Sequence, residues 1–255
     1  WEGNSDVPTA EDVALLLGWL ELRAHRKLAV LGSPIRGVDA AEEICLSIRA
    51  ALNDVRRRKD AAELELLKVV VKATAAGHAK AREVIRPGIS ERHIQIEMEA
   101  EMFRHGAHET GYGTIVGIGS NAAVLHSEPS ERVVSPEDVV LIDAGGAISG
   151  YTADVTRTYP AGAAFTSEQQ VIYDVVLAAE TEAISRCHAG TEWHDVHRAA
   201  ARVIAQGLRD LGILKGEIEG LVDSGATALF FPHGIGHMTG LGVRDVGGCL
   251  TGRNH

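Results

Sequence analysis

Two aspartates beside a predicted strand turn constrain this chain more than any other feature. Asp143 ends an apolar, β-branched run over residues 139–142, and Asp154 lies within residues 151–159, which alternate as expected for the neighbouring antiparallel strand. An aspartate inside an apolar strand is costly to bury unless it is paired or binds a metal. Two such carboxylates can share one site, so the pattern predicts either a cation site or an ion pair, for instance with Arg157.

A glycine-rich segment over residues 232–242 carries two histidines, His233 and His237. They are four residues apart, but the surrounding glycines argue against a helix. The segment therefore predicts a loop whose backbone comes close to a ligand, with an imidazole on either side. A further histidine, His126, follows a predicted strand and turn, and taken alone it indicates only a surface loop.

The hydrophobic periodicity predicts a mixed fold. Helices are expected over residues 60–85, 91–105, 166–187 and 193–211, and strands over 114–118, 139–142 and 151–159, with a turn near Gly145 and Gly146. Ser90 is the expected cap of the second helix, whose residues Ile94, Met98 and Met102 form one apolar side. Helix pairs alternating with hairpins indicate an α+β fold with an antiparallel sheet.

The first part of the chain has a different pattern. Residues 9–22 predict a helix, residues 28–34 a short buried strand, and residues 45–55 another helix. The basic run at 56–59 then marks a junction. We expect two regions, residues 1–55 and residues 56–255.

Composition excludes some partners. The formal net charge is −10, which argues against nucleic acid or an anionic membrane as the main partner. No apolar stretch reaches the ~18–20 residues of a membrane span. The three cysteines are far apart and odd in number, a poor disulfide framework, so a reducing cytoplasm is the expected setting.

The motifs occur together in an order that resembles aminopeptidase P and prolidase, within the pita-bread group that also holds methionine aminopeptidase and creatinase. They cover residues 114–117, 125–126, 141–145, 150–159 and 233–237, and the resemblance extends over about residues 57–248. It implies an α+β pita-bread fold, an antiparallel sheet flanked by helices. Residues 1–55 resemble the remnant of the N-terminal α/β domain that these enzymes carry.

The resemblance also implies a chemistry. Two divalent metal ions are expected, Mn²⁺ first, with Zn²⁺, Co²⁺ and Fe²⁺ as alternatives. By motif, Asp143, bridging Asp154 and His237 correspond to metal ligands, and His126 and His233 to catalytic histidines that contact substrate. A water activated between the ions would attack the bond before proline. The expected protein is thus a homodimeric Xaa-Pro aminopeptidase or dipeptidase that acts on proline-containing peptides.

The sequence departs from the family pattern in two places. Arg244 stands where the family has a third histidine; arginine can contact a substrate carbonyl or carboxylate but cannot act as a neutral base near pH 7. The family's two glutamate ligands lie on C-terminal strands, and the sequence ends at His255 before any matching segment. We therefore expect a C-terminally short chain: a truncated form, a natural short form, or one that takes these ligands from another chain.

Two other functions fit these departures. The first is a non-peptide hydrolase of the same fold, as creatinase is, which needs no metal. The second is a relative that is catalytically incomplete and only binds. Metal content separates the first from a metallopeptidase.

Overall fold

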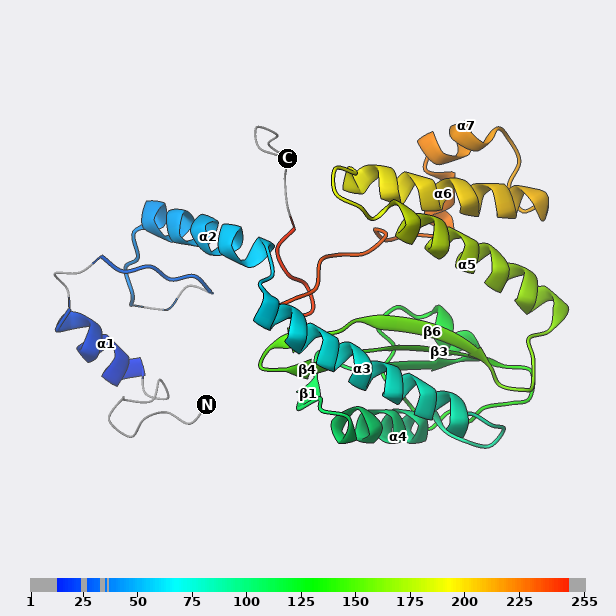
Figure 1. The fold of residues 1–255 in the computed structure, drawn as a ribbon, viewed down its shortest axis with the longest axis horizontal. Helices are drawn as coiled ribbons and strands as arrows, with labels where there is room; N and C mark the ends of the chain where they lie inside the picture. The colour runs from blue at the N-terminus through cyan, green and yellow to red at the C-terminus, as the bar shows by residue number, and fades with distance from the viewer. Residues whose placement is uncertain (1–12, 24–26, 33–34, 36, 248–255) are drawn as a thin grey trace. The chain divides into compact units, whose positions relative to one another are not determined.

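The computed structural model describes residues 13–23, 27–32, 35 and 37–247 (Figure 1). The chain forms two compact units, one of Trp1–Arg58 with Gly248–His255 and one of Lys59–Gly247. That residues 1–55 are the end of a separate N-terminal domain stays a prediction.

The first unit contains helices α1 (Val13–Glu21) and α2 (Glu42–Arg57). The strand predicted over residues 28–34 is wrong for residues 28–32, which have no strand conformation, and residues 33–34 lie outside the described part. Side chains of α2 bind this backbone in place of a partner strand. The Val30 N–H donates to Cys45 Sγ at 3.3 Å, and Arg49 donates to the Leu31 carbonyl at 3.1 Å.

The second unit begins with two capped helices, α3 (Ala61–Val84) and α4 (Glu91–Arg104). Asp60 and Glu63 form a capping box, in which each side chain accepts from the backbone N–H of the other, at 2.9 and 2.7 Å. The Ser90 hydroxyl accepts from the N–H at the third position of α4, which confirms the predicted cap.

Within the described residues, six short strands form two antiparallel sheets, which confirms the α+β class. The first sheet has the order β1-β4-β5, and the second has the order β2-β3-β6. The strands are β1 (Glu109–Thr110), β2 (Ile115–Ile118), β3 (Val139–Ala144), β4 (Gly146–Ile148), β5 (Tyr151–Thr152) and β6 (Val155–Pro160). A 3-10 helix, η1 (Gly119–Ala123), follows β2.

The chain passes between the two sheets three times, after β1, β3 and β5, and the last two crossings correct the predicted hairpin. β3 continues into β4 past Gly145, and the strand predicted over 151–159 is interrupted at residues 153–154. The reversal lies at Ser149 and Gly150, both with positive φ, rather than near Gly145 and Gly146. A Cβ on Gly145 would lie 1.7 Å from the Ala153 carbonyl oxygen, so glycine lets the two crossing segments touch.

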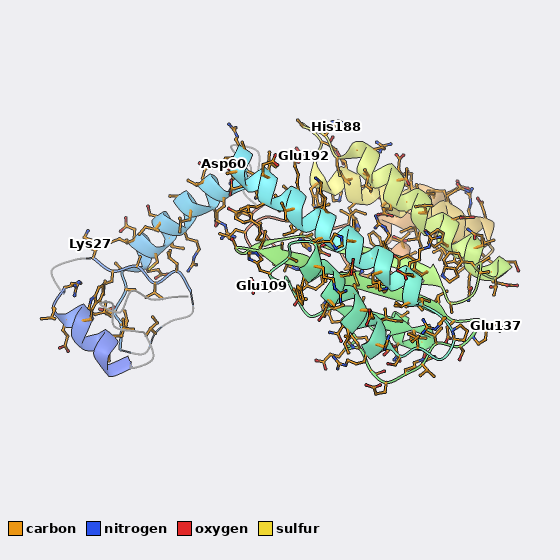
Figure 2. All side chains as sticks on the ribbon, turned by 60° about the horizontal axis from the view of Figure 1, so that its bottom comes forward. Lys27, Asp60, Glu109, Glu137, His188 and Glu192 are labelled. Atoms are coloured by element: carbon orange, nitrogen blue, oxygen red, sulfur yellow. The ribbon has the colours of Figure 1, made fainter. Side chains whose placement is uncertain are left out.

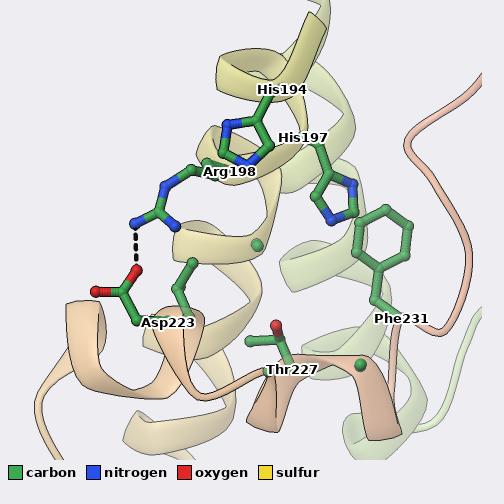
Figure 3. Close-up of a pocket in the computed structure, with 10 residues that line it drawn as sticks. His194, His197, Arg198, Asp223, Thr227 and Phe231 are labelled. Atoms are coloured by element: carbon green, nitrogen blue, oxygen red, sulfur yellow. Dashed lines mark hydrogen bonds and ion pairs between the residues drawn. The ribbon is translucent and has the colours of Figure 1, made fainter. Parts of the chain in front are cut away.

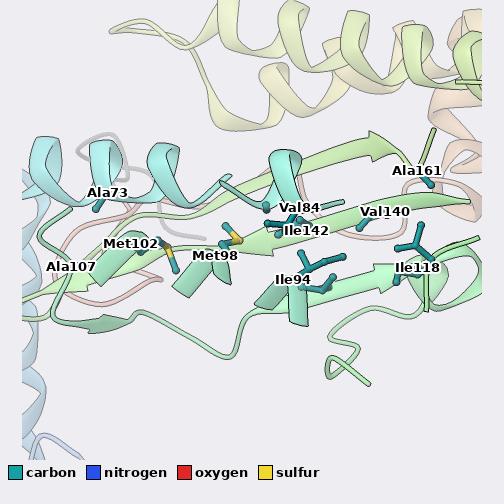
Figure 4. Close-up of a cluster of buried hydrophobic side chains, with 14 residues drawn as sticks. Ala73, Val84, Ile94, Met98, Met102, Ala107, Ile118, Val140, Ile142 and Ala161 are labelled. Atoms are coloured by element: carbon teal, nitrogen blue, oxygen red, sulfur yellow. The ribbon is translucent and has the colours of Figure 1, made fainter. Parts of the chain in front are cut away.

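The main core lies between helices α3 and α4 and strands β2 and β3 (Figure 4). Ile94, Met98 and Met102 are fully buried there, as the sequence predicted, and Val116 and Ile142 meet them from the sheet. This packing fixes one face of β3 and leaves the opposite face for polar groups.

A second helical group follows the sheets. It consists of α5 (Ser167–Arg186), α6 (Trp193–Asp210) and α7 (Ile218–Asp223), followed by the 3-10 helix η2 (Ala226–Leu229). Small residues close the α5–α6 contact around Ala183 and Ala200, and Figure 2 marks the connection between these helices at His188 and Glu192. Among the described residues, no helix is both long and apolar enough to span a bilayer.

Candidate metal centre

The two aspartates lie where the chain changes sheets. Asp143 is on the face of β3 opposite the buried Ile142, and its register partners are Ile115 and Thr156. Asp154 lies in the gap between β5 and β6 rather than inside a strand, which corrects its predicted setting. The crossing still brings the two carboxylates together.

Tyr112 links the two carboxylates. Its hydroxyl lies 2.5 Å from Asp143 Oδ1 and 2.9 Å from Asp154 Oδ1. A phenol has one proton, so it donates to one carboxylate at a time. Gly111 holds the tyrosine close, because its N–H donates to the Gly145 carbonyl at 2.8 Å.

Tyr112 was not predicted from the sequence. The available signal was a tyrosine between two glycines directly before a strand. A Cβ on Gly111 would lie 1.9 Å from the Thr152 side chain, so this approach requires glycine.

The electrostatics of the pair favour a cation. Burial raises the pKa of Asp143, and the neighbouring Asp154 raises it further, against the hydrogen bonds from Tyr112 and Thr156. Burial, followed by the hydrogen bond to Asp143, also raises the pKa of Tyr112. Two partly buried carboxylates that repel each other gain from a positive ion between them.

His237 completes the predicted ligand set. Its Nε2 lies 3.0 Å from Asp154 Oδ2, and both side chains are about a quarter exposed, at 26% and 24%. Its Nδ1 lies 3.2 Å from the Met238 carbonyl oxygen. A backbone carbonyl that accepts from Nδ1 orients the ring so that Nε2 faces the carboxylates.

The donor chemistry fits a divalent ion. Carboxylate oxygens with one imidazole nitrogen suit Mn²⁺, Zn²⁺, Co²⁺ or Fe²⁺. Within the described part of the chain, however, no three His, Cys, Asp or Glu side chains converge closely enough to hold one ion. Tyr112 links the two aspartates to each other, and His237 contacts only Asp154 of the two. The distances between the three side chains are therefore those of their hydrogen bonds.

His126 is exposed, at positive φ, in the loop that follows η1. Both ends of this loop are tied to the buried carboxylate of Glu91. Oε1 accepts from the Ile118 N–H at 2.8 Å and from Asn121 Nδ2 at 2.9 Å, while Oε2 accepts from the Ser130 N–H and hydroxyl at 2.9 and 2.5 Å.

Glu91 was not singled out from the sequence, because a glutamate in the first turn of a helix is ordinary. Burial alone would raise its pKa, but the hydrogen bonds from Ser130, Ile118 and Asn121 outweigh burial and lower it. A charged, fully hydrogen-bonded carboxylate thus fixes the loop that carries His126.

His233 is exposed and supported by an aromatic column. The Phe231 ring meets His233 edge-on, with centroids 5.6 Å apart, and stacks on His197 of α6 at 5.0 Å. Figure 3 shows His197 and Phe231 side by side. His197 was also missed, since a histidine on an amphipathic helix gives no distinct signal.

A pocket of about 320 Å³ lies beside this column. Its walls come from α6, α7 and η2, with Arg198 paired to Asp223 at 2.6 Å (Figure 3). The pocket lining does not include Asp143, Asp154 or His237. We place the candidate site at the carboxylates, where two like charges, a phenol and an imidazole converge.

Arg244 is exposed, on a segment that extends the first sheet. The Thr152 N–H donates to the Gly240 carbonyl at 3.1 Å, and the Gly242 N–H donates to the Gly150 carbonyl at 2.6 Å. No described side-chain contact fixes the guanidinium, which is available to a ligand.

The chain matches known proteins over most of its length. The profile of metallopeptidase family M24 matches residues 65–254. The Xaa-Pro aminopeptidase of Escherichia coli (strain K12) is 39% identical over 199 residues, which is 78% of this chain and 45% of that protein. The Xaa-Pro aminopeptidase of Haemophilus influenzae is 39% identical over 202 residues, 79% of this chain and 47% of that protein.

Solved structures agree with the fold. Proline aminopeptidase P II from Yersinia pestis has a TM-score of 0.76 at 40% identity, over 78% of this chain and 46% of that one. The Pseudomonas aeruginosa aminopeptidase PepP has a TM-score of 0.79 at 33% identity, over 98% of this chain and 54% of that one. The chain spans about half the length of the curated relatives it matches. The chain has the pita-bread fold and belongs to metallopeptidase family M24.

Proposed function

We propose that this chain supplies ligands for divalent metal ions to a site that hydrolyses Xaa-Pro peptide bonds. The observation that carries the proposal is the meeting of Asp143, Asp154 and His237 where the sheets cross, in a chain of a metallopeptidase family. Relatives at 39% identity are named Xaa-Pro aminopeptidases, which supports the same bond specificity.

The residues have separate roles in this proposal. Asp143, Asp154 and His237 would hold the metal. Asp154 lies between the other two, because it shares the Tyr112 hydroxyl with Asp143 and contacts His237 directly. When bound, divalent ions stabilise the negative charge that develops on the scissile carbonyl oxygen and lower the pKa of a bound water. His126 and His233 are exposed imidazoles that can donate a hydrogen bond to the substrate carbonyl or the leaving amine. Arg244 would bind a substrate carboxylate.

The finer identities also belong to the proposal. Mn²⁺ is the expected metal, because hard carboxylate oxygens dominate the donor set. A homodimer and a cytoplasmic setting are proposed as well. Cys187 is free and exposed, which is compatible with a reducing compartment.

The test is hydrolysis of an Xaa-Pro dipeptide and an Xaa-Pro-Xaa tripeptide by metal-stripped protein, with and without added Mn²⁺. We expect Mn²⁺-dependent cleavage that Asp154→Ala abolishes and Asp174→Ala, an aspartate on α5, leaves unchanged. Mn²⁺ affinity and stoichiometry, measured by calorimetry on the same samples, should fall with Asp154→Ala alone.

Two outcomes separate the alternatives, and a third tests the role of Arg244. Cleavage without metal, unaffected by chelators, would contradict the metal-dependent site and favour a creatinase-like hydrolase. Metal binding without cleavage would indicate a binding-only relative. In Arg244→Gln, a larger decrease in the hydrolysis rate of the dipeptide than of the tripeptide would support the assignment of Arg244 to the substrate carboxylate.

A further inference from the structure

A buried ion pair ties the histidine segment to the start of α3. Lys59 Nζ lies 2.8 Å from Asp245 Oδ2, and the two side chains are only 9% and 1% exposed. Desolvating both charges is costly, and replacing one partner alone removes the attraction that offsets this cost. An ion pair in this position therefore constrains geometry more than it adds stability.

Asp245 also organises its own segment. Oδ2 accepts from the Leu241 N–H at 3.0 Å, and Oδ1 accepts from the Val246 N–H at 2.7 Å. A Cβ on Gly240 would lie 2.2 Å from Asp245 Oδ2 and 2.5 Å from Lys59 Cε. Glycine at 240 is thus what lets the backbone close over the ion pair.

The same residue reaches the histidine. The Asp245 N–H donates to the Met238 carbonyl at 2.8 Å, and that carbonyl oxygen lies 3.2 Å from His237 Nδ1. The chain of contacts runs from Lys59 through Asp245 and Met238 to the ring whose Nε2 faces Asp154. Outer partners of this kind orient a metal-ligating imidazole.

We infer that Lys59 and Asp245 are positioning residues that hold His237 toward the carboxylates. The ion pair clamps residues 238–246 in one conformation, and the Met238 carbonyl passes that constraint to the imidazole. The metal-binding part of this inference rests on the proposed function. The clamping part concerns the chain alone.

Hydrogen exchange on the metal-free full chain tests the clamp. Asn keeps only one of the two acceptor oxygens, so in Asp245→Asn at least one of the amides of Leu241 and Val246 should exchange about tenfold faster or more, while amides of α4 keep their rates. Glu65→Gln is the matched control: it breaks an ion pair of the same chemistry, Lys68–Glu65 at 2.7 Å, which is exposed on α3. Unchanged exchange at Leu241 and Val246 would overturn the inference.

Zn²⁺ binding tests the consequence for the ligand. Asp245→Asn should weaken Zn²⁺ affinity by about 10- to 100-fold, as expected for loss of an outer partner. The double variant Lys59→Met/Asp245→Leu removes both charges, so its thermal stability should return close to the wild-type value. It still lacks the acceptor for Leu241 and Val246, so its Zn²⁺ affinity should stay low and its exchange fast.

The two readouts separate the inference from the proposed function. Wild-type protein that binds no Zn²⁺, with fast exchange in Asp245→Asn, would refute the metal centre and support the clamp. Wild-type Zn²⁺ affinity in the double variant would refute the positioning role and leave the metal centre intact.

Discussion

At the residue scale, one phenol proton serves two carboxylates. Tyr112 is within hydrogen-bond distance of both Asp143 and Asp154, and only one of them can accept at a given moment. The other carboxylate must take its stabilisation from elsewhere. In the proposed function a divalent ion would supply it, so we expect the cation and the phenol to stabilise the same pair of carboxylates.

We predict that Tyr112→Phe raises the pKa of Asp143 further, because the hydrogen bond from Tyr112 lowers it in the wild type. The free energy of unfolding at pH 7 should fall by about 1–3 kcal/mol, the usual cost of an unsatisfied buried polar group. Carboxyl-carbon NMR titration and chemical denaturation measure the two effects. Tyr173→Phe on α5, where the ring packs against Phe165, is the control and should change neither.

At the element scale, helix α3 is joined to β6 by a buried imidazole. His78 Nδ1 lies 3.1 Å from the Tyr159 hydroxyl, and Nε2 lies 3.0 Å from the Val155 carbonyl oxygen. Burial lowers the pKa of His78 to about 4, with Arg157 contributing in the same direction against the Val155 hydrogen bond. The helix therefore packs on the strand beside Asp154 through a neutral ring.

This predicts an acid-sensitive contact. The unfolded chain protonates His78 near pH 6.5 and the folded chain near pH 4, so the unfolded state binds more protons between these values. Stability should fall as the pH drops through that window, by about 3 kcal/mol in total. Denaturation of His78→Gln from pH 7 to pH 4 should show a shallower loss than wild type. His188→Gln, at an exposed site between α5 and α6, should match wild type.

The sequence predicted elements better than their connections. Helix α4 was predictable because its cap and its apolar side, Ile94 to Met102, are local signals. The crossing between the sheets was not, because it depends on Gly145 meeting the Ala153 carbonyl across space. The same holds for Tyr112, whose role appears only when residues far apart in sequence converge. The roles of Asp143, Asp154 and His237 as metal ligands stay predictions.

At the scale of the whole molecule, the chain is two compact units, and the M24 profile begins at residue 65, within the second. The second unit contains the main core and every candidate site residue. A unit with its own continuous core has what it needs to fold alone.

We therefore predict that residues 59–247, expressed alone, fold and keep the slow hydrogen exchange of α4 and β3. Their thermal transition should lie within a few degrees of the main transition of the full chain, since the same apolar surface is buried. Calorimetry and exchange measure this. A fragment that is unfolded at 25 °C would mean that the first unit is needed for the core.

The anchoring of residues 118 and 130 to Glu91 has a consequence for how this protein can change. One carboxylate holds both ends of the intervening stretch, so a change of conformation in its middle is not passed on to the elements on either side. Insertions or deletions around His126 would leave β2 and α4 where they are. The length of this stretch can therefore change without a change in the scaffold, and with it the distance that the His126 imidazole can extend toward the site.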